Sequence, residues 1–121
     1  MDVRKDRMRE RTTQFAVRVY RLSSALSKTR SARGIADQIL RSGTSVGAHY
    51  AESCRARSKA DFINKIFGAM QELEETICWL RVIETCELMT PTRLSALRAE
   101  MTELTAIFVT MVKNSRAGTA S

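Results

Sequence analysis

Five arginines near the N-terminus have the spacing of residues on one face of a helix. They are separated by three, four, seven and three residues, and they are Arg4, Arg7, Arg11, Arg18 and Arg21. Guanidinium groups in such a row can replace the counterions along a phosphate backbone, and they bind it with little regard to base sequence. A solvated face that only keeps a protein soluble shows the same pattern. Because few acidic residues lie four positions away to neutralise the row, we favour nucleic acid as its ligand.

Aromatic residues are scarce beside this arginine row. Tyr20 is the one candidate nearby for stacking on a base. Proteins that hold single strands by stacking use several aromatic side chains. We therefore expect phosphate contacts, with either RNA or DNA, to dominate over base stacking.

A second polar group falls on two helices expected in the middle of the chain. Its members are Arg41, Ser45, Glu52, Glu72 and Glu75. A hydrogen-bonded ion-pair cluster between the two helices would satisfy all of them, which is a structural role. Two of the carboxylates could instead act as acid and base. The chain has one histidine, His49, and no pattern of a substrate pocket, so we expect no enzyme.

The sequence does not supply the ligands of a familiar metal or cofactor site. A di-iron centre in a helical bundle needs Glu-x-x-His on each of two helices, and one histidine cannot provide that. His49 with Glu52 and Cys54 does not have a zinc spacing, and a hydrogen-bonded interfacial histidine is the simpler interpretation. No glycine-rich phosphate loop is present. We expect neither metal nor cofactor.

Charge and cysteine usage indicate where such a protein works. The net charge is +7, and it is concentrated in residues 1–60, which hold 14 Lys/Arg against 5 Asp/Glu; residues 61–121 hold 6 against 8. Polyanions are the partners that suit such a basic half. Three cysteines without CxxC spacing favour a reducing compartment. No run reaches the roughly 18 apolar residues that span a bilayer. We expect a cytoplasmic protein with no membrane segment.

Apolar residues at alternating intervals of three and four predict the helices that would position these side chains. The expected ranges are 6–28, 35–55, 58–87 and 90–113. Ser58 with Asp61 resembles a capping box, and Thr90 before Pro91 is typical of a helix start. The prediction is an all-α, up-down-up-down antiparallel four-helix bundle over residues 1–113. Residues 114–121 lack an apolar period and are expected to be a disordered tail.

The second of these helices has an unusual face. Small residues, Ser42, Gly43, Gly47 and Ala51, stand where an ordinary helix would bury larger ones. Each glycine inside a helix costs about 1 kcal/mol against alanine, so packing explains them better than helix propensity does. We expect a neighbouring helix to approach closely there, either within the chain or between copies of it.

Helices two and three contain a set of segments that together cover about half the chain: Gln38-Ile-Leu-Arg-Ser-Gly-Thr-Ser-Val-Gly-Ala, Ala51-Glu52, Ser58-Lys-Ala-Asp-Phe-Ile-Asn-Lys, Glu72, Glu75-Thr76 and Trp79-Leu80. These segments resemble the bacterial "four helix bundle protein" family, which includes the proteins encoded in 23S ribosomal RNA intervening sequences. Accessory proteins of diversity-generating retroelements belong to the same group. His49 stands where the family usually has asparagine, and Cys78 where it often has tyrosine, so packing around helix two could differ.

The resemblance implies the same bundle, commonly assembled into a ring-like homopentamer, and no known catalytic activity. For the retroelement members it implies binding to nucleic acid and to a reverse transcriptase. Residues and resemblance together predict a non-enzymatic, oligomeric protein that binds nucleic acid or acts as an adaptor. The alternative is a protein–protein interaction scaffold whose basic face recruits an acidic partner without nucleic acid.

Overall fold

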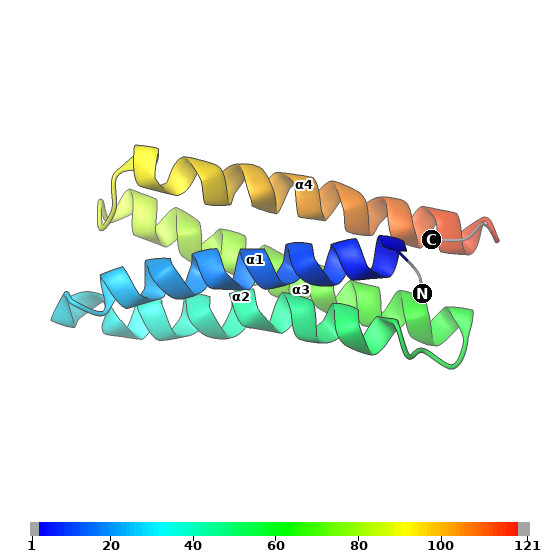
Figure 1. The fold of residues 1–121 in the computed structure, drawn as a ribbon. Helices are drawn as coiled ribbons and strands as arrows, with labels where there is room; N and C mark the ends of the chain where they lie inside the picture. Colours follow the sequence, from blue (N-terminus) through cyan, green and yellow to red (C-terminus); the bar gives the residue numbers. More distant parts are fainter. Residues whose placement is uncertain (1–2, 119–121) are drawn as a thin grey trace.

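The computed structural model describes residues 3–118, which form four long helices and one short 3-10 turn. The elements are α1 (Val3–Leu26), η1 (Arg30–Ala32), α2 (Arg33–Ser53), α3 (Lys59–Thr85) and α4 (Pro91–Arg116). Neighbouring helices run antiparallel, and both ends of the described chain lie at the same end of the bundle (Figure 1). No strand occurs within residues 3–118. The predicted all-α four-helix bundle is confirmed.

The four helices do not approach one another equally. α2 packs closely against both α1 and α3, whereas α1 and α4 are the neighbouring pair that approach least. Long side chains therefore fill more of the space between α1 and α4 than between the other neighbouring helices.

Close packing of α1 on α2 depends on two glycines of α2. A Cβ added to Gly43 would lie 2.7 Å from a methyl carbon of Val19, and one added to Gly47 would lie 3.2 Å from the hydroxyl oxygen of Thr12. On the other side of α2, the buried Thr76 hydroxyl donates to Ser42 Oγ at 2.8 Å. The small residues of α2 thus serve helix packing inside the subunit. Ala51 differs from them, because it is exposed.

The buried seams follow the predicted intervals of three and four. Phe15, Val19, Leu104 and Phe108 on the outer helices are fully buried, as expected from their spacing. On α3 the buried face consists of Ile66, Ala69, Leu73, Thr76, Leu80 and Ile83. The larger Phe62, Met70 and Ile77 are only partly buried against it.

The helix ends follow the predicted caps, with two differences. Ser58 Oγ accepts from the Asp61 amide at 3.0 Å, but the Asp61 carboxylate accepts weakly from the Arg57 amide at 3.4 Å instead of closing the box on Ser58. α4 continues to Arg116, three residues beyond the predicted boundary. Burial of Ser115 and the position of Arg116, 5.5 Å over the Phe67 ring, hold this last turn. Residues 119–121 of the expected tail lie outside the described residues.

The helices within residues 3–118 are amphipathic throughout. None of them is long and apolar enough to cross a bilayer.

Candidate nucleic-acid interface

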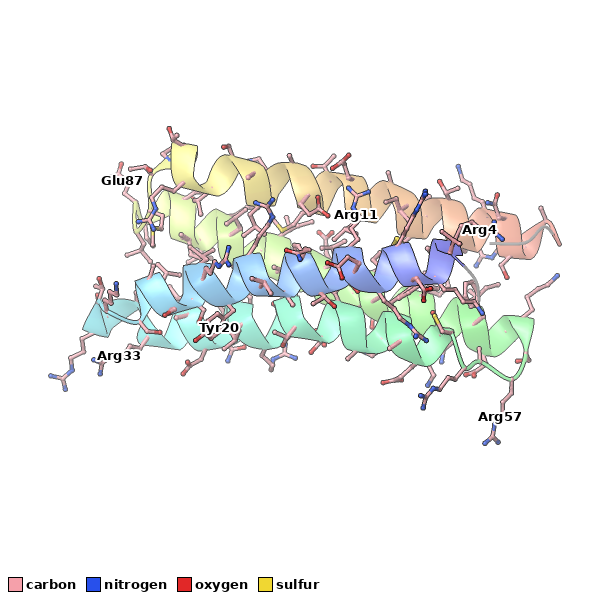
Figure 2. The ribbon with its side chains drawn as sticks, viewed as in Figure 1. Arg4, Arg11, Tyr20, Arg33, Arg57 and Glu87 are labelled. Carbon is pink, nitrogen blue, oxygen red and sulfur yellow. The ribbon has the colours of Figure 1, made fainter. Side chains whose placement is uncertain are left out.

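The arginine row lies on the flank of α1 that is next to α4. In Figure 2 the side chain of Arg11 lies between α1 and α4, and Arg4 lies near the N-terminal end of the same helix. Arg4, Arg7 and Arg11 line a cavity between the two helices, and Arg18 and Arg21 line a second one farther along. The structure therefore keeps the predicted row on one side of α1, facing the most open seam of the bundle.

Arg11 differs from the other members of the row because α4 neutralises it. Its Nε donates to Glu100 Oε1 at 2.9 Å, and its Nη2 donates to Glu103 Oε2 at 2.8 Å. The hydrogen bond to Glu100 is the main cause that raises the pKa of Arg11, against the opposing effect of burial. An arginine held by two carboxylates has little capacity left for a phosphate. Arg11 is therefore not equivalent to the other four arginines of the predicted row.

Two cavities lie along this seam, one on each side of the Arg11 ion pairs. We call the seam with both cavities the α1–α4 groove. The first cavity has a volume of about 300 Å³ and is lined by Arg4, Lys5, Arg7, Met8, Arg11, Tyr50, Ile107 and Met111. The second has about 200 Å³ and is lined by Arg18, Arg21, Leu22, Met89, Arg93, Leu94, Ala96 and Leu97. Among residues 3–118, no acidic residue lines either cavity.

Five cations at the rims of these cavities form no ion pair within residues 3–118. We call them the groove cations, and they are Lys5, Arg7, Arg18, Arg21 and Arg93. Three of them belong to the predicted row. Lys5 was missed because it lies off the helical spacing, and Arg93 was missed because it comes from α4, which only the tertiary fold brings beside α1.

The aromatic residue of the groove is Tyr50 and not Tyr20. Tyr20 is 59% exposed and extends on the side of α1 nearer to α2 (Figure 2). Tyr50 reaches the first cavity from α2, and it is only 4% exposed. Its ring packs 6.4 Å from that of Phe108. Nothing in the sequence showed that Tyr50 borders a cavity.

The second polar group is smaller and more exposed than expected. Arg41 Nη1 donates to Glu72 Oε2 at 3.4 Å, and its Nη2 also pairs with Glu75. Trp79 Nε1 lies 3.5 Å from the same Glu75 oxygen. The Arg41 hydrogen bond is the largest cause that lowers the pKa of Glu75. Because the Arg41 side chain is 52% exposed, this cluster is a surface ion pair between α2 and α3.

Two predicted members do not join that cluster. Glu52 pairs instead with Lys65, at 3.5 Å, because it lies eleven residues after Arg41, or about 16 Å along the helix. Ser45 donates its hydroxyl to the Arg41 carbonyl of its own helix at 2.7 Å. The carboxylates of Glu72 and Glu75 do meet, and both pair with Arg41. This arrangement joins α2 to α3 and is structural.

His49 packs on α3 at the edge of this cluster. Its Nε2 lies 3.9 Å from Glu72 Oε2. Its Nδ1 is buried against Gly68 and has no hydrogen-bond partner among the residues that the structure describes. A Cβ at Gly68 would come within 2.7 Å of that nitrogen. Within residues 3–118, no three His, Cys, Asp or Glu side chains gather as they would around a metal ion.

Comparison with known proteins identifies the family. The family model for the 23S rRNA-intervening sequence protein matches residues 4–110. The chain belongs to this family. A crystal structure of a protein of unknown function from the S23 ribosomal protein family of Bacteroides thetaiotaomicron is similar, with 34% identity and a TM-score of 0.83. The match covers 87% of this chain and 97% of that one. No curated protein matched the chain.

The 23S rRNA-intervening sequence protein match includes all of the groove cations, from Lys5 to Arg93. It confirms the resemblance stated from helices two and three and extends it over α1 and most of α4. The relation to retroelement accessory proteins stays a prediction.

Proposed function

We propose that this member of the 23S rRNA-intervening sequence protein family is a non-enzymatic adaptor that binds nucleic acid through the α1–α4 groove. The observation that carries the proposal is the set of groove cations, which come from two helices and have no ion pair within residues 3–118. Cations that are not neutralised internally gain most from replacing the counterions of a polyanion. The name of the family refers to 23S rRNA, so ribosomal RNA is the first ligand to test.

The length of the groove suits a short stretch of backbone. Lys5 and Arg21 are sixteen residues apart on α1, which corresponds to about 24 Å along the helix. One strand of a duplex carries a phosphate about every 3.4 Å. The groove cations therefore span roughly seven nucleotides, and they provide contacts that position a strand without reading its sequence.

We also propose that the protein is a homo-oligomer, a ring of five of about 68 kDa, or five times the 13.6 kDa chain. The glycines of α2 already pack against α1, so a contact between subunits needs another surface. The surface that we propose is the uncharged outer face of α1 and α2: Thr13, Tyr20, Thr44, Ala48 and Ala51, all exposed. Five copies of the groove would raise the affinity for a long nucleic acid through multivalency.

A reverse transcriptase is the protein partner that we propose to look for. The prediction that this chain is related to retroelement accessory proteins supports it. A neighbouring gene for such an enzyme would be the first observation to seek.

The experiment that tests the proposed function is ultraviolet crosslinking in cells, followed by sequencing of the nucleic acid bound to the protein. Arg7, Arg18 and Arg21 are changed together to Gln in one variant. The matched control changes Arg33, Arg57 and Arg81 to Gln, which removes the same charge from exposed positions outside the groove; Figure 2 shows Arg33 and Arg57 extending from opposite ends of the molecule. We expect crosslinked RNA or DNA with the wild type and the control and little with the groove variant. Recovery of an acidic protein in place of nucleic acid would favour the scaffold alternative.

A further inference from the structure

The α1–α4 groove combines charge with buried apolar surface. In the first cavity the rim is cationic, whereas the floor consists of Tyr50 and Met8, which are 4% and 8% exposed, together with Ile107 and Met111. Phosphate contacts alone require only the rim. A floor of this kind fits a ligand that also has a flat apolar part.

The second cavity repeats the arrangement at the other end of the groove. Arg18, Arg21 and Arg93 surround a floor to which Leu94 and Leu97 contribute, and these two leucines are 1% and 5% exposed. Leu22 of this cavity and Met8 of the first are fourteen residues apart on α1, or about 21 Å. Two sites, each with a cationic rim and an apolar floor, therefore lie on one side of the molecule.

The size of the cavities limits what enters them. Their volumes of about 300 and 200 Å³ lie at or below the low end of the range for pockets that hold small molecules. One nucleobase is a group of suitable size and shape. In a duplex the bases are stacked inside and only phosphates reach a protein groove of this kind, whereas bases of a single strand can turn out and stack on aromatic or apolar side chains.

The Arg11 ion pairs argue against a rigid rod lying along the groove. Arg11, Glu100 and Glu103 cross the seam between the two cavities, and the Glu103 side chain is 62% exposed. An acidic amphipathic helix would need a continuous trough, and it would meet these carboxylates midway. A flexible strand with separate side groups can occupy the two cavities and pass over the crossing.

We infer that the ligand of the α1–α4 groove is single-stranded nucleic acid, with phosphates on the groove cations and unstacked bases inserted into the two cavities. This inference rests on the proposed function, since it names the class of nucleic acid that the same groove would take. It replaces the sequence-based expectation that base stacking plays little part, because Tyr50 and the methionines supply the surface that Tyr20 does not.

The test compares three labelled probes by fluorescence anisotropy at one low salt concentration: a single strand, the same strand with abasic sites, and the strand paired as a duplex. The abasic strand keeps its phosphates and loses the groups that would fill the cavities. We expect the intact strand to bind roughly tenfold more tightly than the abasic strand, with the same salt dependence, and also more tightly than the duplex.

Two variants connect that preference to the groove. Ile107→Ala removes part of the floor of the first cavity, and we expect it to narrow the ratio between the intact and abasic strands. Val109→Ala is the matched control, since Val109 is also partly buried on α4 but does not line the cavity, and it should preserve the ratio. Circular dichroism verifies that both variants keep the helical content of the wild type.

The possible failures are distinguishable. Equal binding of the three probes would overturn the base-insertion inference and leave the proposed function standing. Absence of binding to every probe at low salt would overturn both. Displacement of the intact strand by a polyglutamate peptide of matched charge, at equal concentration, would assign the groove to an acidic protein instead.

Discussion

Arg11 on α1 and Glu100 on α4 form a two-point ion pair across the pair of neighbouring helices that approach least, with donor–acceptor distances of 2.9 and 3.3 Å. The contact joins the first helix of the chain, α1, to the last one, α4. It also separates the two cavities of the α1–α4 groove. One arginine of the row is thus used for the fold, and its neighbours remain for a ligand.

Substitutions of Arg11 and Arg7 distinguish an effect on stability from an effect on nucleic-acid binding. Arg11→Gln should lower the free energy of unfolding by about 1 kcal/mol, since it breaks a bidentate pair that is partly shielded from water, and should lower Tm by a few degrees. Arg7→Gln should leave Tm unchanged but weaken binding of nucleic acid more than Arg11→Gln does. Thermal circular dichroism and anisotropy measure the two effects. If the same variant had the larger effect on both Tm and the affinity for nucleic acid, these roles would be contradicted.

The Arg41–Glu75 pair predicts a small dependence of stability on pH. The pKa of Glu75 lies below its ordinary value of 4.5 in the folded chain, mainly because Arg41 hydrogen-bonds its charged form. The unfolded chain therefore takes up a proton first as pH falls, and the contribution is present above about pH 4.5 and lost below it.

Comparison with Glu75→Gln isolates that contribution, because every other side chain is the same in both proteins. Wild type should melt about 1–2 °C above the variant at pH 7, and the two should converge near pH 3. A gap that persists or widens in acid would mean that Glu75 acts through something other than its charge. The gap is small because this pair is exposed, whereas a buried ion-pair cluster would give a large one.

Gly43 should be intolerant of a side chain because of Val19. Gly43→Ala gains about 1 kcal/mol of helix propensity but overpacks a fully buried valine, at a cost of about 1–3 kcal/mol. We expect a net loss of stability. Gly34→Ala is the matched control, since no atom of residues 3–118 outside the adjoining helix backbone lies within 4 Å of the position of its Cβ, and it should not destabilise.

A double-mutant cycle locates the cause of that effect. If the clash is with Val19, the Gly43→Ala/Val19→Ala protein should be more stable than the sum of the two single effects predicts. Urea unfolding gives the four free energies. If the two single changes in the free energy of unfolding simply add, the Gly43→Ala side chain clashes with a residue other than Val19.

Tyr20 tests the proposed contact between subunits. Tyr20→Glu places a charge on the uncharged outer face of α1 and α2, where a second copy would bury it at considerable cost. Light scattering coupled to gel filtration should show an oligomer for the wild type, near 68 kDa for five chains of 13.6 kDa, and a smaller species for the variant. A wild type that is monomeric at micromolar concentration would refute self-association, and an unchanged oligomer in the variant would move the contact elsewhere.

Local signals predicted most of the fold. The three-and-four spacing that includes Phe15 and Val19, and the caps at Ser58 and Thr90, act within a few residues, so the sequence alone reveals them. The end of α4 was placed too early, because Ser115 and Arg116 are held by contacts with distant parts of the chain, which have no periodic signature.

The candidate site was only partly predictable, for the same reason. The row on α1 follows from helical spacing, but its neutralisation at Arg11 depends on Glu100, which is 89 residues away. Arg93 and Tyr50 reach the groove from two other helices. Glu52 was assigned to the wrong cluster because it lies on the same helix as Arg41. Three helical turns separate the two residues, so they do not contact the same partners.

The most direct test of the central claim is the salt dependence of nucleic-acid binding by the groove variant, with Arg7, Arg18 and Arg21 changed to Gln. Affinity for a labelled single strand is measured by anisotropy across a salt series, beside the wild type and the control in which Arg33, Arg57 and Arg81 are changed. Each lost phosphate contact should reduce the log–log slope by about 0.7, so the groove variant should bind more weakly with a slope shallower by about 2. The control should keep the affinity and slope of the wild type. Equal losses in the two variants, or none in the groove variant, would contradict a nucleic-acid interface between α1 and α4.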